Sequence, residues 1–271
     1  MPIDVTSTEE QKKGEKMDLQ LTGKIALITG ASGGIGLETA KILAEEGAQT
    51  IIIGRRQGAL DELAGEIAAK GGLKPFVVVE DITKVGGDLR VRDKVMAKFD
   101  RVDIVVNNLG QARSFGLKAP DSSWDEAFYL NFTSARKMAE AFLEGMCERK
   151  FGRIINLTST LEPFGMSGSH TSKAALLVWA KGLSRMVAKD DVTVNCISPG
   201  ILVTEQIRNH FIPTVLPKFG GEENFFKNEV PAGHFGEPSD AAQLIAFLCS
   251  PKAHYITGQR ICVDGGWYRH I

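Results

Sequence analysis

Three glycines in the stretch IALITGASGGIG, residues 25–36, carry the clearest chemistry in this sequence. Gly30, Gly34 and Gly36 follow an apolar run of strand type and stand where a helix would begin. Glycine lets the backbone approach a ligand closely, and the free N–H groups and dipole of a helix N-terminus favour an anion. The spacing G-x-x-x-G-x-G departs from the G-x-G-x-x-G of the general dinucleotide fingerprint. We therefore expect a phosphate site here, with a tight turn that only packs a helix on a strand as the alternative.

Strand-like and helix-like segments alternate along the chain and would position this turn. Apolar strand-like runs occupy 25–29, 50–54, 76–80, 103–107, 153–159, 192–198 and 260–264. Helix-like segments occupy 35–46, 57–70, 88–99, 122–149, 169–188 and 239–249. Parallel strands need crossover helices, so this alternation is typical of a sheet covered on both faces. It predicts an α/β fold with a single doubly wound parallel sheet, a Rossmann domain over 19–271.

One long stretch without a clear period covers about 200–237 and is rich in proline and glycine. Such a segment inside a compact domain is usually a lid or a binding loop, so we expect the substrate loop here. Its apolar residues favour an apolar or aromatic ligand, although they could equally close the core: Ile201, Leu202, Ile207, Phe211, Ile212, Leu216, Phe219, Phe225 and Phe226.

Composition argues against several function classes. The formal net charge is −1 with both signs interspersed, which predicts a small-molecule substrate and neither a nucleic-acid nor a membrane partner. Cys147, Cys196, Cys249 and Cys262 form no C-x-x-C pair, so we expect no metal site and no disulfide framework. Residues 1–18 hold no apolar core of the signal-peptide type, which predicts a flexible N-terminal arm on a cytoplasmic protein.

Several motifs, in order from about residue 20 to 267, resemble those of the short-chain dehydrogenase/reductase family. They are LTGK at 21–24, TGASGGIG at 29–36, NNLG at 107–110, PGILVT at 199–204 and VDGGW at 263–267. The resemblance implies a Rossmann fold, a homo-oligomer (tetramer or dimer) that packs through the helices at 122–149 and 169–188, and a nicotinamide dinucleotide. The cofactor-binding residues that it implies are Gly30, Ser32, Gly34, Ile35, Gly36, Arg55, Asp81, Ile82, Asn108, Gly110, Lys173, Pro199, Gly200 and Thr204.

The end of the second strand bears on the choice of cofactor. An acidic residue there would bind the ribose 2′-hydroxyl and repel a 2′-phosphate. This chain has Gly54 followed by Arg55 and Arg56, and an arginine can fork two donors onto a phosphate. We therefore expect NADP(H) to be preferred over NAD(H), with solvated loop arginines as the alternative.

The catalytic residues depart from the family at one position. The family typically uses Asn, Ser and a Tyr-x-x-x-Lys pair, and the resemblance implies that Asn131, Ser159 and Lys173 fill three of these places. Ser169 stands four residues before Lys173, where the tyrosine would be, and the loop from Ser159 to Ser169 is shorter than usual in the family. A phenol with a pKa near 10 can be brought toward neutrality by an ammonium group, whereas a serine hydroxyl is far less acidic.

Three groups could replace the missing proton donor. They are Lys173, directly or through water, His170 and Glu162. On a helix His170 would point about 100° away from Ser169, which favours a partly exposed residue at the helix start. Glu162 fits a loop carboxylate in water. We expect proton transfer to depend on Lys173 far more than on Ser169.

Two function classes remain open at this stage. The first is an NADP(H)-dependent oxidoreductase that interconverts a carbonyl and an alcohol. There Ser159 would polarise the carbonyl, Asn131 would hold a water, and Lys173 would order the ribose and relay the proton. The second keeps the dinucleotide site but performs non-redox chemistry, as an isomerase, lyase or cyclase, or acts as a binding module.

Overall fold

The structure is a computed structural model that describes residues 17–269. Its centre is a seven-stranded parallel sheet in the order β3-β2-β1-β4-β5-β6-β7. The strands are β1 Ile25–Thr29, β2 Gln49–Gly54, β3 Phe76–Val79, β4 Ile104–Asn107, β5 Gly152–Leu157, β6 Val192–Pro199 and β7 Arg260–Val263. This confirms the single doubly wound parallel sheet that the alternating segments predict.

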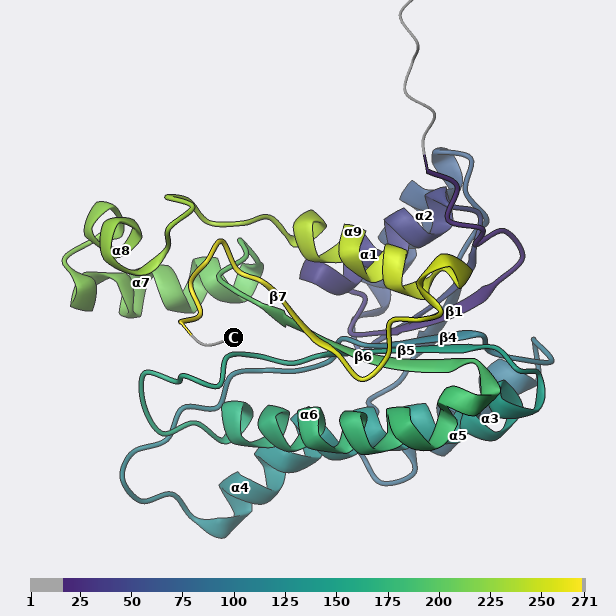
Figure 1. The fold of residues 1–271 in the computed structure, drawn as a ribbon, viewed down its shortest axis with the longest axis horizontal. Coiled ribbons are helices and arrows are strands. Elements are labelled where there is room, and N and C mark those ends of the chain that lie inside the picture. Colours follow the sequence, from purple (N-terminus) through teal and green to yellow (C-terminus); the bar gives the residue numbers. More distant parts are fainter. Residues whose placement is uncertain (1–16, 270–271) are drawn as a thin grey trace, which may run out of the picture.

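Helices cover both faces of the sheet (Figure 1). α1 Gly34–Glu45, α2 Gln57–Ala69 and α9 Pro238–Cys249 lie on one face, and α3 Gly87–Met96, α5 Ser134–Glu148 and α6 Gly168–Val187 lie on the other. Short 3₁₀ turns follow α6 at Ala188–Asp190 and α9 at Pro251–Ala253. Each face has its own apolar core, and residues of alternate orientation on β1, such as Ile28 and Leu27, enter one core each. Both sides of the strands are therefore buried, which accounts for their continuous apolar runs.

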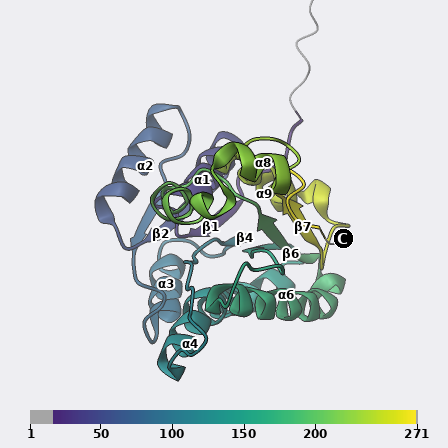
Figure 2. The same ribbon diagram turned by 90° about the vertical axis from the view of Figure 1, so that its left-hand side faces the viewer.

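The strand order changes direction between β1 and β4. β2 and β3 follow on the far side of β1, and β5, β6 and β7 follow on the far side of β4. In open sheets of this kind, ligands bind in the crevice outside the carboxyl ends of the strands at this switch point. Figure 2 views the molecule from this end, with α4 Asp121–Phe128 below the sheet and α8 Glu222–Glu229 in front of it.

The helix expected over 122–149 is interrupted. α4 runs into a π-helical turn, η1 at Tyr129–Thr133, and only then into α5. A π-turn adds one residue to the helical turn, and such insertions occur frequently at functional sites. Here it contains Asn131, whose side chain is buried at 1% exposure.

The segment at 200–237 is not the irregular loop that we expected. It contains a π-helical turn η3 Ile207–Phe211, α7 Ile212–Thr214, a 3₁₀ turn η4 Leu216–Phe219 and α8. Its apolar side chains pack on one another around Phe225, which is fully buried. Proline and glycine therefore separate short helices here, and most of the apolar residues close a small core of their own.

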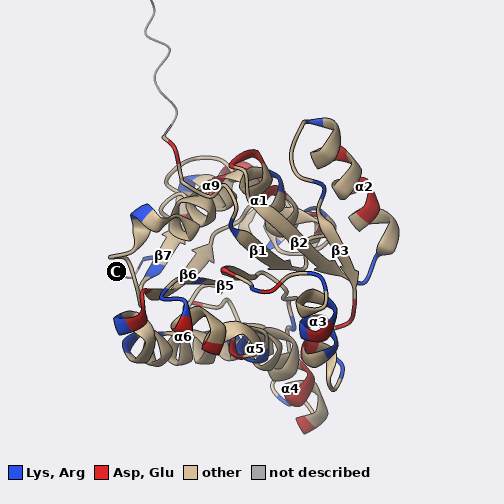
Figure 3. Ribbon diagram, turned by 90° about the vertical axis from the view of Figure 1, so that its right-hand side faces the viewer, with Lys and Arg blue, Asp and Glu red and all other residues tan. Residues whose placement is uncertain are grey.

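The predicted arm at 1–18 lies outside the described residues except for Met17 and Asp18, which are exposed. Lys, Arg, Asp and Glu mix on the surfaces of α2, α3, α5 and α6 (Figure 3). Within residues 17–269, no helix combines the length and apolarity that crossing a membrane requires.

Candidate active site

The glycine-rich turn after β1 is shaped by contacts that exclude side chains. Gly30 and Gly34 have φ values of +66° and +57°, in the region that favours glycine. A Cβ on Gly36 would lie 2.4 Å from Asn108 Nδ2 and 2.7 Å from the carbonyl oxygen of Gly30. The Asn108 amide in turn donates to the carbonyls of Thr29 and Gly30 at 3.0 and 3.1 Å. The end of β4 thus holds the turn in place, and Gly36 is required by close packing.

The N-terminus of α1 faces this turn. Within the described chain, α1 has neither a side-chain cap nor an acidic residue in its first turn, which holds Ile35. Thr204 closes the same space from the other side, because a Cβ on Gly34 would lie 3.2 Å from Thr204 Cγ2. Gly200 is packed against the backbone of Asp264, at 2.6 Å from a Cβ to its Cα. The segment after β6 therefore meets the glycine turn, and the two enclose an anion-compatible helix end.

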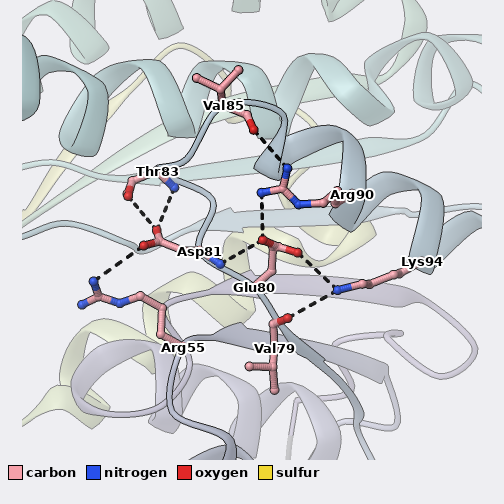
Figure 4. Close-up of polar contacts among 8 residues, drawn as sticks. All are labelled: Arg55, Val79, Glu80, Asp81, Thr83, Val85, Arg90 and Lys94. Atoms are coloured by element: carbon pink, nitrogen blue, oxygen red, sulfur yellow. Dashed lines mark hydrogen bonds and ion pairs between the residues drawn. The ribbon is translucent and has the colours of Figure 1, made fainter.

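The end of β3 lies beside this turn and is fixed by charge (Figure 4). Asp81 accepts from the backbone N–H and the hydroxyl of Thr83 at 3.0 and 2.6 Å, and Arg55 lies 3.9 Å from its other oxygen. Partial burial opposes ionisation of Asp81, but the Thr83 hydrogen bonds and the Arg55 charge outweigh it and hold the pKa of the carboxyl below its usual value. Asp81 is therefore an ionised, oriented acceptor at the edge of the crevice.

Glu80 fixes the backbone at Asp81. Its two oxygens accept from Arg90 at 3.0 Å and Lys94 at 3.2 Å, and Oε1 also accepts the backbone N–H of Asp81 (Figure 4). The next predicted cofactor residue, Ile82, is buried at 5% exposure and joins the core beneath. The contacts of Arg90 and Lys94 with Glu80 tie α3 to the end of β3.

Arg56 is closer to the glycine turn than the predicted Arg55. Its Nη2 donates to the carbonyl of Ser32 at 2.8 Å, and its Nη1 lies 3.6 Å from Glu205. A Cβ on Gly33 would lie 3.3 Å from the Arg56 guanidinium, and one on Gly54 would lie 3.4 Å from Ser32 Oγ. Arg56 thus covers the place where a side chain at Gly33 would lie. The pair of arginines in the sequence indicates a basic edge but does not say which one folds over the turn.

Asn131, Gly110 and Lys173 come together at the other end of the crevice. A Cβ on Gly110 would lie 2.8 Å from Lys173 Nζ and 3.0 Å from Asn131 Oδ1. The Asn131 side chain exchanges hydrogen bonds with the backbone of Gln111, at 3.1 and 3.3 Å, and donates to the carbonyl of Ala127 at 3.1 Å. These contacts fix the position of the segment after β4. The Asn131 side chain bonds to backbone groups, so a water in this site would be held by groups other than this amide.

Lys173 lies in a desolvated place. Its Nζ donates to the carbonyl of Leu157, at the end of β5, at 2.7 Å. Burial disfavours the ammonium form and lowers the pKa of Lys173 to about 8. Lys173 therefore titrates near neutrality, as acid–base groups in active sites often do.

Ser159 follows β5 by two residues and carries an unsatisfied hydroxyl. Its Oγ is buried and has no hydrogen-bond partner among the described residues, whereas its carbonyl accepts from Ser198 at 3.3 Å. Buried hydroxyls are nearly always paired, so an unpaired one close to a crevice indicates a place for a ligand atom.

Ser169 opens α6 one helical turn before Lys173. It is buried, and its Oγ accepts the backbone N–H of Arg113 at 3.3 Å and lies 2.9 Å from Ser167 Oγ. Ser167 Oγ lies 2.7 Å from His170 Nδ1. Motif spacing pointed to neither Ser167 nor Arg113, although a serine just before a helix is a familiar N-cap.

Two other candidate donors have committed contacts. Glu162 is exposed and accepts the backbone N–H of Arg269 at 3.4 Å. Tyr268, which directly follows the VDGGW motif, donates its hydroxyl to the Pro199 carbonyl. Burial first of all, with nearby Cys262 and Asp264, raises the pKa of Tyr268, the opposite of what an activated phenol needs.

Comparison with known proteins decides the family. The family model described as enoyl-(acyl carrier protein) reductase matches residues 30–268. The chain is 35% identical over 260 residues to the 3-oxoacyl-[acyl-carrier-protein] reductase of Vibrio harveyi, covering 92% of this chain and 99% of the relative. The protein belongs to the short-chain dehydrogenase/reductase family. The corresponding reductase of Aquifex aeolicus is 32% identical over 93% of this chain and 100% of its own length.

Solved short-chain reductases share the whole fold. The L-sorbose reductase of Gluconobacter frateurii, complexed with NADPH and L-sorbose, has a TM-score of 0.86 and 31% identity, and covers 94% of this chain and 100% of its own. YwfH, an NADPH-dependent reductase involved in bacilysin biosynthesis, has a TM-score of 0.86 and 28% identity, and covers 92% of this chain and 99% of its own. Membership makes this chain an enzyme of the NAD(P)-dependent oxidoreductase class.

Proposed function

We propose that this short-chain dehydrogenase/reductase interconverts a carbonyl and an alcohol with NADP(H). The observation that carries the proposal is the buried, unpartnered hydroxyl of Ser159, two residues after Leu157, whose carbonyl accepts from Lys173. Negative charge that develops on a carbonyl oxygen is stabilised by a hydrogen-bond donor and by a nearby cation. Ser159 would be this donor, and Lys173 would be this cation.

The chain fits a nicotinamide dinucleotide. Gly30, Gly34 and Gly36 let the turn pack closely on Asn108 and Thr204, and the turn leads into the uncapped N-terminus of α1, which would hold a pyrophosphate, with Ser32 and Ile35 in the same turn. Asp81 and Ile82 would border the adenine, Asn108 and Gly110 the riboses, and Pro199, Gly200 and Thr204 the nicotinamide. When bound, the cofactor supplies or accepts the hydride.

Preference for the phosphorylated cofactor rests on the basic edge of the crevice. Arg55 and Arg56 flank the end of β2, where Gly54 offers no carboxylate to repel a 2′-phosphate. Arg56 would bind this phosphate while it also holds Ser32. The NADPH complexes of related reductases agree with this choice.

The chain's own residues divide the remaining work. Ser159 donates a hydrogen bond to the substrate oxygen and polarises it. Lys173 would order the ribose of the bound cofactor and would stabilise negative charge at that oxygen, and Asn131 fixes the backbone at Gln111. Ser169 takes the motif position of the family's tyrosine, four residues before Lys173. It would therefore present a hydroxyl in the first turn of α6.

An apolar or aromatic substrate group would lie against the short loop after Ser159. Leu161, Phe164 and Met166 are all about half exposed there, and Phe164 packs 5.7 Å from Trp267, centroid to centroid. A cavity of about 230 Å³ opens beside them, lined by Thr160, Glu162, Pro163, Phe164, Glu229, Trp267, Tyr268 and Arg269. This loop, rather than the phenylalanines of α8, therefore supports an apolar or aromatic substrate group.

The proposal is tested by Ser159→Ala. Loss of one donor to a developing oxyanion costs about 10²–10³-fold in kcat, and NADPH affinity should stay unchanged. Ser184→Ala is the control, since that hydroxyl bonds within α6, to the Lys181 carbonyl. Equal activity of Ser159→Ala and the wild type would remove Ser159 from the mechanism.

We also propose a homo-oligomer, a tetramer or a dimer, in the cytoplasm. Val178 and Met186 project from α6 at 75% and 72% exposure, and both lie within the 169–188 helix through which the family resemblance implies that subunits pack. Light scattering of the purified protein tests this proposal, and a monomer at micromolar concentration would refute it.

A further inference from the structure

Three side chains at the start of α6 form a continuous hydrogen-bonded chain. Ser169 Oγ lies 2.9 Å from Ser167 Oγ, which lies 2.7 Å from His170 Nδ1. Ser167 is the N-cap residue of α6, and its Oγ also accepts the backbone N–H of His170 at 3.3 Å. This capping contact folds Ser167 back over the first helical turn, so it bridges two side chains that point in different directions.

We propose that His170 is the proton reservoir of the reaction and acts through Ser167 and Ser169 in place of the absent tyrosine. The inference rests on the proposed carbonyl–alcohol chemistry and names its acid–base group. In this proposal Ser169 would meet the substrate oxygen, and Ser167 and His170 act through it.

The chemistry of the hydroxyls requires such a reservoir. Serine does not release its proton near neutral pH, whereas an imidazole changes its charge between about pH 5 and 8. Ser169 and Ser167 are both buried, at 6% and 7% exposure, while His170 is partly exposed. The chain therefore runs from a buried hydroxyl on the Lys173 side of the helix to a ring that water can reprotonate.

Backbone contacts hold the two serines in register. Gly168 N–H donates to the carbonyl of Arg113 at 2.9 Å, and Arg113 N–H donates back to Ser169 Oγ. With an acceptor site of Ser169 occupied by that N–H, its hydroxyl proton is left to point along the chain or toward a ligand. The Arg113 carbonyl also accepts from Ser167 Oγ, at 3.3 Å, a longer contact than the 2.9 and 2.7 Å that Ser167 Oγ makes to Ser169 Oγ and His170 Nδ1. The segment after β4 thus holds both serines, and the Ser167 proton turns from this carbonyl to Ser169 when the relay operates.

The other candidate groups make contacts outside this chain of side chains. Lys173 donates to the Leu157 carbonyl, Glu162 accepts the backbone N–H of Arg269, and the Tyr268 phenol donates to the Pro199 carbonyl. From the sequence we expected proton transfer to depend on Lys173 far more than on Ser169. The proposed relay differs from that expectation, because it carries the proton through Ser169.

In the reductive direction, the carbonyl carbon gains a hydride from NADPH, and the electron pair of the C=O π-bond moves onto the oxygen. This oxygen takes the proton of Ser169, Ser169 takes that of Ser167, and Ser167 takes that of the His170 imidazolium at Nδ1. The substrate is reduced by two electrons, NADPH is oxidised to NADP⁺, and water reprotonates His170. Oxidation of the alcohol runs the same path backwards, with neutral His170 as the final acceptor.

The charges around His170 set the direction of the pH dependence. Burial first, and then the positive charge of Lys173 on the same helix, lower the pKa of His170 below its ordinary value of 6.5. Arg113 lies in the segment after β4, which packs against the start of α6. Its guanidinium is paired with Glu126 of α4 at 2.7 Å. The imidazolium form is therefore populated only in acid, so the reductive rate should rise as the pH falls below 6.5.

The test compares His170→Asn, which keeps a polar group near Ser167 but cannot titrate, with His254→Asn at the end of the 3₁₀ turn after α9. His170→Asn should lower kcat at least about 100-fold, the low end for a general acid, and abolish the rise toward acid pH. KM for NADPH should not move. Ser169→Ala should behave alike, whereas Ser172→Ala, whose hydroxyl bonds back to the Gly168 carbonyl, should not.

A second readout does not depend on turnover. NMR titration of the histidine rings in the protein without cofactor should show the His170 pKa shift on Ser167→Ala and stay unchanged on Ser172→Ala. An unshifted His170 resonance, or an acid limb that survives in His170→Asn, overturns the relay while the reductase proposal stands. A wild type that shows the NMR coupling but never oxidises NADPH overturns the proposed function and, with it, the catalytic role of the chain.

Discussion

Removal of the Arg56 guanidinium should weaken NADPH binding and leave NADH binding almost unchanged. A hydrogen bond to a charged group contributes about 1.5–3 kcal/mol. The Arg56 side chain is 57% exposed, so solvent screening reduces this contribution. We expect Arg56→Ala to cost about 1–2 kcal/mol, or about 5–30-fold in the Kd of NADPH.

The assay is a fluorescence or calorimetric titration of both cofactors at two salt concentrations. The salt dependence of NADPH binding should fall in Arg56→Ala, since one charge pair is lost. Arg55→Asp, which puts a carboxylate beside the phosphate, should reverse the ranking so that NADH binds more tightly. Arg92→Ala is the control, because that exposed arginine pairs with its neighbour Asp93 on α3.

One result would refute the reasoning. If Arg56→Ala weakens NADH and NADPH equally, then Arg56 supports the turn through its hydrogen bond to the Ser32 carbonyl and does not recognise the phosphate. A wild type that binds the two cofactors with equal affinity would refute the preference altogether.

Further predictions concern packing, charge and the chain ends. Gly36→Ala should weaken cofactor binding about tenfold or more, because overpacking costs about 1–3 kcal/mol, whereas Gly58→Ala, where a Cβ meets nothing within 4 Å, should be nearly silent in the same titration. Reductive turnover, which already falls as His170 loses its proton, should fall more steeply as the pH rises through about 8, where Lys173 loses its proton, and Lys173→Ala should abolish turnover at every pH; no steeper fall near pH 8 would dissociate Lys173 from catalysis. Arg153→Ala should destabilise the fold by about 3–5 kcal/mol in chemical unfolding, because this fully buried guanidinium donates to three backbone carbonyls. A chain that starts at Met17 should melt within a few degrees of the full-length protein; a larger loss would mean that the predicted arm docks on the body.

The fold could be predicted from local patterns because the strands are buried on both faces. Runs such as IALIT and TIIIG have no polar face, and only a parallel sheet with helices on both sides buries them fully. The glycine turn could also be predicted from its glycines, because Gly36 has no space for a Cβ.

Features that depend on side-chain packing could not be predicted. Apolar period alone does not distinguish one long helix from α4 and α5 joined by the π-turn around Asn131. The helices within 200–237 were missed because prolines and glycines separate them into turns too short for a periodic signal.

The link from Ser169 to His170 shows why spacing alone is incomplete. The expected angle of about 100° between neighbouring helix positions is sound, and it excludes direct contact between these two side chains. Ser167 lies outside the regular helix, at φ −147° and ψ 119°, so helical geometry does not describe its position. Its role follows from N-cap geometry, in which the hydroxyl turns back to the third residue.

The central claim is redox chemistry at Ser159 and Lys173, and cofactor-linked turnover measures it most directly. The purified protein is mixed with NADPH and a panel of ketones that includes 3-oxoacyl thioesters, ketoses and aryl ketones, and both NADPH loss and alcohol formation are quantified. We predict that at least one ketone yields one alcohol for each NADPH oxidised, and that Ser159→Ala loses this turnover while it still binds NADPH. Tight NADPH binding with no oxidation by any ketone, and no reduction of NADP⁺ by the matching alcohols, would contradict the account and favour non-redox chemistry at the same site.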